Sequence, residues 1–231
     1  MHTPVDFIIS LGGTCKTAHH LKRNNLRIAA NPFDWLMCYT LANVTDIITT
    51  RFETFFRDIQ EDNTRKTRNG CRYIFDKNNN FVSMHDFKKK IDIHSQYTTF
   101  YDKMKLRFYR MLEYINHSES VMFICNRDEN ISNFENFIKN ISEIFDKKYL
   151  FVNVRHHDDT STIIKRTYNL TEKICIIEYI FYDIHSKGPT GHSDYWMGST
   201  DNWDIILNEY QLSPLFNMQA PRSEAGFCHM D

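Results

Sequence analysis

The chain has 231 residues, which is long enough to bury a substantial core, and we predict a single domain over residues 1–231. Its formal net charge of −1 argues against a general nucleic-acid binder, and no apolar run reaches the length of a membrane span. No basic region precedes the short apolar run near the N-terminus, so we expect no cleaved signal peptide. The six cysteines form no CxxC pair, which is typical of reduced thiols and not of a common zinc site.

The first predicted element is a buried strand over residues 7–10, followed by a Gly-Gly pair. Thr14 is a good N-cap for a predicted helix over residues 16–23. Cys15 then lies in the first helical turn, beside free backbone N–H groups and the positive end of the helix dipole. Both favour the thiolate, which is the reactive form of cysteine. The alternative interpretation is a cysteine that packs as a small hydrophobic side chain.

The next predicted helix covers residues 41–56, where apolar side chains recur at helical spacing. The preceding sequence NPFDW at residues 31–35 breaks the pattern, because proline keeps its neighbour extended. We expect Asp34 to cap the helix that follows. Residues 60–70 are polar and charged, which predicts an exposed loop.

Two short strands are predicted at residues 72–75 and 80–84, joined by the turn-forming sequence DKNNN. His85 follows the second strand directly, at a place where active-site residues are often presented. The alternative is a surface histidine with local hydrogen bonds, because histidine is common at surfaces and edges.

The longest predicted helix covers residues 97–115, and its Met and aromatic stripe is typical of a core contact. Residues 120–125 form a compact apolar run that predicts a central strand. Asp128 follows this strand, and functional groups gather beyond the carboxyl ends of strands in open α/β sheets. Asp128 is therefore well placed to orient a histidine or, alternatively, to cap a helix over residues 131–145.

The last third of the chain predicts strands at residues 149–154 and 174–184 and a helix at residues 203–210. The His-His-Asp-Asp sequence at residues 156–159 suggests a metal site. Adjacent strand residues point to opposite faces, however, and no second histidine motif completes a ligand set. We therefore predict no metal, and we predict no cofactor because the chain has neither a GxGxxG motif nor a P-loop.

The order of these elements predicts an α/β fold, with α+β as the alternative. We expect a mixed central sheet flanked by helices. Its parallel strands should include residues 7–10, 121–125 and 151–154.

Several short motifs together resemble one known protein family. The sequences SLGGTC at residues 10–15, PFDW at 32–35 and HDF at 85–87 are similar to motifs of an uncharacterised bacterial family of papain-like cysteine peptidases. The pattern also resembles TecA-type effectors, which are deamidases of Rho-family GTPases delivered by a type VI secretion system. WMG at residues 196–198 and DNW at 201–203 are similar to the end of the family, so the resemblance spans most of the chain.

The resemblance implies a catalytic domain of papain-like type with a Cys-His-Asp triad. The nucleophile falls on Cys15 and the histidine on His85. The acid falls on Asp128, with Asp86 and Asp92 as alternatives.

The chemistry implied by this triad is thiol acyl transfer. His85 would accept the Cys15 proton, and the thiolate would attack an amide carbonyl. The Cys15 backbone N–H, with a donor near Gly13 or Thr14, would stabilise the oxyanion. Ammonia or an amine leaves, and water then hydrolyses the thioester.

The resemblance further implies a protein substrate, and the near-zero net charge argues against a nucleic-acid partner. The leading expectation is deamidation of an Asn or Gln side chain of a host Rho-family GTPase by a virulence effector. A cysteine peptidase of another substrate and a non-catalytic interaction protein that keeps the fold are the alternatives. The implied location is the bacterial cytoplasm, or a host cell reached without a cleaved signal peptide.

Overall fold

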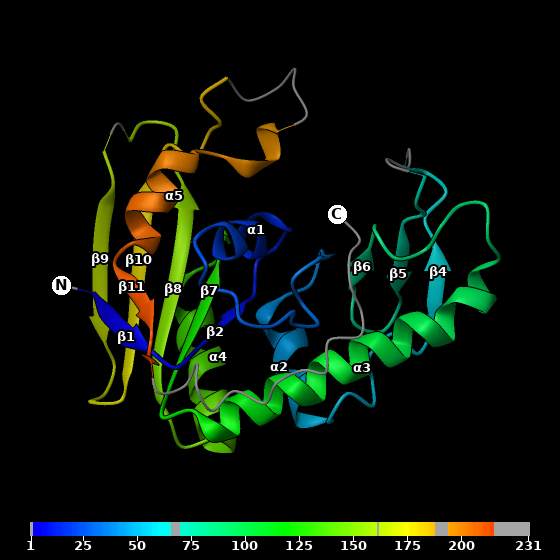
Figure 1. The fold of residues 1–231 in the computed structure, drawn as a ribbon, viewed down its shortest axis with the longest axis horizontal. Helices are drawn as coiled ribbons and strands as arrows, with labels where there is room; N and C mark the ends of the chain where they lie inside the picture. Colours follow the sequence, from blue (N-terminus) through cyan, green and yellow to red (C-terminus); the bar gives the residue numbers. More distant parts are fainter. Residues whose placement is uncertain (1, 66–69, 161, 188–193, 215–231) are drawn as a thin grey trace.

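A computed structural model describes residues 2–65, 70–160, 162–187 and 194–214. Its main feature is a five-stranded mixed sheet, which we call the large sheet (Figure 1). In spatial order its strands are β2 (Phe7–Ser10), β7 (Ser120–Cys125), β8 (Lys148–His156), β10 (Ile174–Phe181) and β9 (Ile164–Asn169). The first four are parallel, and β9 runs antiparallel to β10 at one edge.

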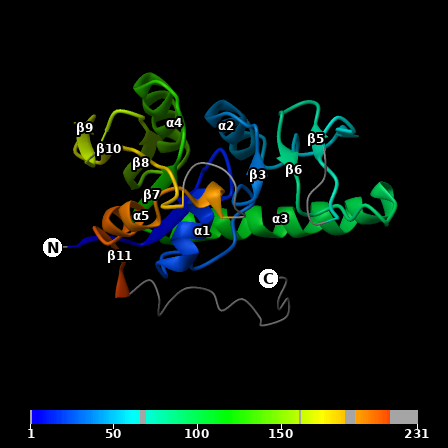
Figure 2. The same ribbon diagram turned by 90° about the horizontal axis from the view of Figure 1, so that it is seen from above.

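Helices cover both faces of the large sheet (Figure 2). On one face, α1 (Lys16–Arg23) and α5 (Thr200–Leu207) pack with the side chains of one apolar cluster. On the other face, α2 (Leu41–Thr49) and α4 (Ile131–Ile144) contribute to a second and larger cluster. The predicted mixed sheet flanked by helices is therefore confirmed.

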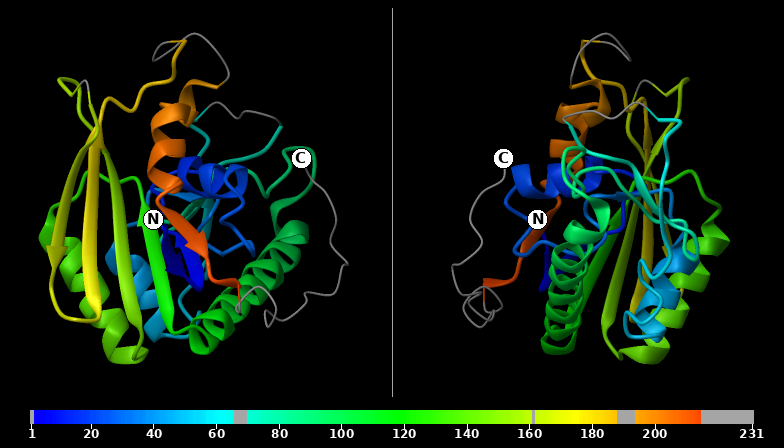
Figure 3. Two further views of the ribbon diagram at one scale, coloured as in Figure 1. Left: turned by 60° about the vertical axis from the view of Figure 1, so that its left-hand side comes forward. Right: turned by 90° about the vertical axis from the view of Figure 1, so that its right-hand side faces the viewer.

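A second, four-stranded antiparallel sheet, which we call the small sheet, lies beside the first. In spatial order its strands are β3 (Leu36–Met37), β6 (Val82–Ser83), β5 (Ile74–Asp76) and β4 (Ile59–Glu61). The long helix α3 (Ile93–His117) starts near the small sheet and ends where β7 begins (Figures 1 and 3). Near the N-terminus, β1 (Thr3–Val5) pairs in parallel with β11 (Tyr210–Leu212).

The buried strands of the large sheet are the elements that the sequence predicts best. Strand β7 has the predicted bounds, and β2 and α1 also begin and end as expected. Parallel strands covered on both faces read as continuous apolar runs, which is a strong local signal. Strand β9 is missing from the prediction because it lies at an edge and is mostly exposed, so its sequence IKRTYN is polar.

The predicted helix over residues 41–56 ends at Thr49, seven residues early. The chain then turns through positive φ angles at Arg51, Phe52 and Phe56. Both phenylalanines are buried even so. Apolar residues at helical spacing therefore extend past the end of the helix, which explains the overlong prediction. Asp34 does not cap this helix, because Thr40 does so with a capping box to Asn43.

Strands β1, β3, β4 and β11 are also missing from the prediction. The remaining differences concern bounds. The predicted helix at residues 203–210 lies at Thr200–Leu207, and Tyr210 belongs to β11. Of the predicted loop over residues 60–70, the first two residues belong to β4, and residues 66–69 lie outside the described residues. Within the part of the chain that the structure describes, no helix is long and apolar enough to cross a membrane.

Candidate active site

Cys15 lies at the start of α1, just beyond the carboxyl end of β2. It is the N-cap residue, with helical φ and ψ, and its side chain makes no capping hydrogen bond. Thr14, which the sequence predicts as the N-cap, only accepts a hydrogen bond from the Lys16 N–H at 3.4 Å. Cys15 is half-buried and lies at a helix N-terminus, as the sequence predicts.

The turn before Cys15 requires glycine at one position. A Cβ atom at Gly12 would lie 2.7 Å from the Thr14 carbonyl oxygen and 2.8 Å from Oγ1 of Thr17. At Gly13, the nearest atom to such a Cβ is the Asn126 carbonyl oxygen at 3.7 Å, an ordinary contact. The close approach of α1 to the turn therefore depends on Gly12 and leaves room at Gly13.

The electrostatics of Cys15 differ from the sequence expectation. Burial raises the pKa of the Cys15 thiol, because the charged thiolate loses hydration. The Cys15 backbone N–H and the charge of Lys16 lower this pKa, but burial is the larger effect. The helix N-terminus alone therefore does not make Cys15 a thiolate, and a further positive charge is needed.

His85 lies two residues after β6, on the small sheet, and is exposed. Its ring meets the Trp35 ring edge to face, with 6.1 Å between centroids. Partial desolvation lowers the pKa of His85, while the charge of Asp86 raises it. Among the described residues, no hydrogen bond or ring contact joins His85 to Cys15. The structure thus places the two groups on different sheets.

The three candidate acids have different surroundings. Asp128 follows β7, on the same sheet edge as Cys15, but its side chain is 92% exposed and lies 3.6 Å from Arg155. Asp86 accepts a hydrogen bond from Ser83 Oγ at 2.6 Å, and its charge acts on His85.

The third candidate, Asp92, accepts the Ser95 N–H at 2.9 Å as the N-cap of α3. Among the described residues, Asp128 therefore has no contact with His85. Asp86 is the candidate acid whose charge raises the pKa of the His85 ring.

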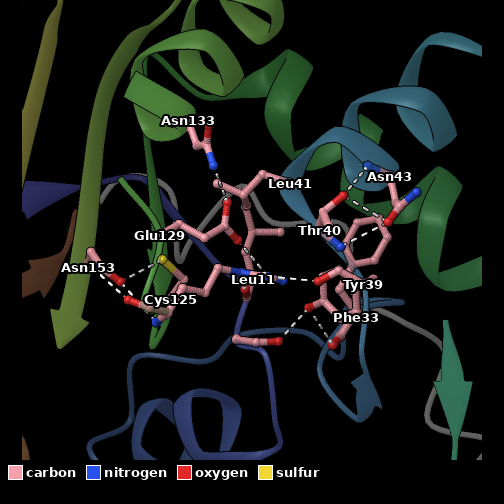
Figure 4. Close-up of polar contacts among 12 residues, drawn as sticks. Leu11, Phe33, Tyr39, Thr40, Leu41, Asn43, Cys125, Glu129, Asn133 and Asn153 are labelled. Atoms are coloured by element: carbon pink, nitrogen blue, oxygen red, sulfur yellow. Dashed lines mark hydrogen bonds and ion pairs between the residues drawn. The ribbon is translucent and has the colours of Figure 1, made fainter. Parts of the chain in front are cut away.

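A buried polar network beside the turn was missed by the sequence analysis (Figure 4). Arg127 donates to the carbonyl oxygens of Leu11 and Tyr39, and Tyr39 OH donates to the Gly12 carbonyl at 2.7 Å. The only sequence signal was the position of Arg127 beside Asp128, directly after a central strand. Because its partners are distant in sequence, local patterns do not reveal them.

A second set of contacts holds Lys16, the residue that follows Cys15. Lys16 Nζ pairs with the buried Asp183 at 2.7 Å, and Asp183 also accepts from Trp203 Nε1 at 3.1 Å. His20 stacks on Trp203 at 4.7 Å and is fully buried. These contacts anchor the first turns of α1 to α5 and to the end of β10.

The His-His-Asp-Asp sequence is engaged in local contacts. His156 hydrogen-bonds Asp158 at 2.9 Å through Nε2, and its Nδ1 accepts the Asp183 N–H at 3.0 Å. The described ranges contain no group of three or more His, Cys, Asp or Glu side chains that could hold a metal ion.

Comparisons with known proteins identify one family and one relative. The family model described as "Putative papain-like cysteine peptidase (DUF1796)" matches residues 6–148, a segment that contains Cys15, His85 and Asp128. The chain is 25% identical over 222 residues to the uncharacterized protein R408 of Acanthamoeba polyphaga mimivirus, covering 87% of this chain and 97% of that protein. No solved structure matches the chain. Neither match bears on a Rho-family GTPase, an effector role or a bacterial source, so these stay predictions.

Proposed function

The chain belongs to the family described as "Putative papain-like cysteine peptidase (DUF1796)", and on this premise we propose that it is a thiol hydrolase of protein amides with Cys15 as nucleophile. One observation supports this proposal most directly. Cys15 stands at the N-terminus of α1, directly after a tight glycine turn and within the matched segment. A thiol in this place meets backbone donors that can also bind an oxyanion.

In the proposed reaction, His85 accepts the Cys15 proton and the resulting thiolate attacks an amide carbonyl carbon. The carbonyl oxygen becomes an oxyanion held by the Cys15 N–H and a neighbouring N–H of the Gly13–Thr14 turn. His85 returns the proton to the leaving amine, and water then cleaves the thioester. Catalytic hydrogen bonds are often long in a free enzyme and tighten when substrate binds, which is compatible with the separate positions of Cys15 and His85.

The pH dependence of Cys15 alkylation by iodoacetamide tests this proposal. Burial raises the pKa of the isolated thiol, so reactivity well below the ordinary thiol pKa of about 8.5 requires an imidazolium beside it. We expect the wild type to react on this acid side and His85→Ala to lose that reactivity. Mass mapping of the Cys15 peptide separates its signal from that of the exposed Cys38.

The matched control is His19→Ala, because His19 lies one helical turn after Cys15 and its N–H donates to the Cys15 carbonyl. It should leave the profile unchanged if His85 is the base. Asp86→Asn should move the profile more than Asp128→Asn, because Asp86 acts on the His85 ring. An ordinary thiol titration in the wild type and in His85→Ala alike would contradict catalysis and favour an interaction protein that keeps the fold.

The finer form of the proposal is deamidation of an Asn or Gln side chain of a protein, with a Rho-family GTPase as the first substrate to test. It is supported by the short motifs around Cys15, Pro32–Trp35 and His85. Incubation of the protein with Rho-family GTPases should produce the mass gain of an amide-to-acid conversion, absent with Cys15→Ala. Cleavage of the GTPase chain instead would assign a peptidase.

A further inference from the structure

We propose that Arg127 and Tyr39 are positioning residues that hold the Cys15 turn against the segment leading to the small sheet, and so set how Cys15 meets His85. This inference rests on the proposed function, since it concerns the geometry of the same two groups. It is carried by a set of buried hydrogen bonds that converge on the backbone just before Cys15.

Arg127 ties three segments of the chain together. Its Nε donates to the Leu11 carbonyl at 2.9 Å, and its Nη1 donates to the Tyr39 carbonyl at 2.7 Å. Nη1 also lies 3.0 Å from Oε1 of Glu129, which balances the charge of the guanidinium. A planar guanidinium offers several donors in fixed directions, so one buried side chain can bind two carbonyls from different segments.

The backbone of Arg127 is itself held from the neighbouring strand. The Asn153 side chain on β8 accepts the Arg127 N–H and donates to the Arg127 carbonyl, both at 3.1 Å. Asn153 also accepts from Cys125 Sγ at 3.2 Å (Figure 4). Arg127 is therefore anchored to the centre of the large sheet before it reaches the turn, and it provides a rigid reference for that turn.

Tyr39 completes the connection from the other side. The Arg127 guanidinium lies over the Tyr39 ring, with 4.6 Å between the Arg127 Cζ atom and the ring centroid. The Tyr39 hydroxyl donates to the Gly12 carbonyl at 2.7 Å. With Leu11 bound by Arg127 and Gly12 bound by Tyr39, two successive carbonyls before Cys15 are held by one stacked pair of side chains.

The same pair reaches the sheet that carries His85. Tyr39 follows β3 closely, and β3 pairs with β6, the strand that precedes His85. The Tyr39 ring also stacks on Phe81, just before β6, with centroids 4.8 Å apart. A shift of Tyr39 would therefore move the glycine turn and the His85 strand relative to each other.

The test compares Tyr39→Phe with Tyr149→Phe. Tyr39→Phe removes a hydroxyl that donates to the Gly12 carbonyl at 2.7 Å and lies 3.3 Å from the Phe33 carbonyl, and Tyr149→Phe removes a hydroxyl that donates to the Phe145 carbonyl at 2.6 Å. We expect Tyr39→Phe to slow acid-side alkylation of Cys15 about tenfold, because small misplacements of reacting groups are costly. Tyr149→Phe should leave this rate unchanged, and comparable Tm values in the two variants exclude a general loss of stability.

Arg127→Lys provides a graded second variant. A single ammonium keeps the charge but cannot reproduce the fork that binds both carbonyls. We expect Arg127→Met to slow acid-side alkylation of Cys15 about a hundredfold. Arg127→Lys should slow this alkylation more than Tyr39→Phe and less than Arg127→Met. A purely structural Arg127 would instead lower Tm without moving the pH profile of Cys15.

Amide NMR shifts of Gly13, Cys15 and His85 separate this inference from the proposed function. If the wild type lacks His85-dependent alkylation, the proposed function fails, while shift changes in Tyr39→Phe at both Gly13 and His85 still support the positioning role. If alkylation depends on His85 and both the profile and the shifts are unchanged in Tyr39→Phe and Arg127→Lys, the positioning role is overturned.

Discussion

The two sheets present their functional groups in different ways. The large sheet holds Cys15 at the end of a parallel strand buried between two apolar clusters. On the small sheet, His85 follows a two-residue strand, and its exposed ring contacts the ring of Trp35. The two groups thus differ in their own exposure, because Cys15 is half-buried and His85 is exposed.

The larger apolar cluster contains side chains of both sheets. Tyr39 and Phe81 connect the small sheet to the glycine turn, and α3 runs along both sheets (Figure 1). The relative position of the two groups therefore depends on packing between the sheets, to which the Tyr39–Phe81 contact contributes. The following changes test that difference, from the largest expected effect to the smallest.

The largest effect is expected for Phe81→Ala. Phe81 is fully buried and packs on Phe33, Tyr39 and Phe55. The cavity should lower the free energy of unfolding by about 3–5 kcal/mol, measured by urea unfolding.

Phe134→Ala is the matched change beside the large sheet, because Phe134 is also fully buried and packs on Phe151. Hydrogen exchange should accelerate at β5 and β6 in Phe81→Ala only. If exchange at β5 and β6 accelerates equally in both variants, the two sheets open together and the expected difference is wrong.

A pH effect is expected at His20, on the Cys15 side. Burial lowers the pKa of His20 from 6.5 to about 4, because the charged ring loses hydration, and the hydrogen bond to the Met197 carbonyl opposes this only in part. Below pH 6.5 the unfolded chain takes up a proton that the folded chain does not, so stability is full above this value and falls toward pH 4. The loss reaches about 3 kcal/mol, since one pH unit corresponds to about 1.4 kcal/mol.

Urea unfolding across this pH window measures the loss, with His20→Gln as the variant that cannot titrate. The wild type should lose more stability on acidification than His20→Gln. Parallel pH curves for the two proteins would show that another group dominates the acid response.

The smallest stability effect is expected at the glycine turn, where a substitution should also change the alkylation of Cys15. Gly12→Ala forces a Cβ against the Thr14 carbonyl and Thr17, and should cost about 1–3 kcal/mol. Gly13→Ala meets only ordinary contacts, so its thermal unfolding should stay close to that of the wild type.

Cys15 alkylation should change in Gly12→Ala and persist in Gly13→Ala. If both variants behave alike, the close packing of α1 on the turn does not control the thiol.

Much of the large sheet could be predicted from local sequence. Strand β7, β2 and α1 have the predicted bounds because buried parallel strands and a glycine-led helix leave clear local patterns. The polar edge strand β9 and the two-residue strand β3 leave no such pattern, because their pairing depends on distant partners.

The sequence by itself determined that Cys15 begins a helix after a glycine turn and that His85 follows a hairpin. Only the tertiary structure decided that burial raises the pKa of Cys15, that Asp86 acts on His85 while Asp128 pairs with Arg155, and that Arg127 binds the turn. The physical reason is that desolvation and charge pairing depend on which distant segments meet. Periodicity and capping signals instead arise from neighbours in the chain.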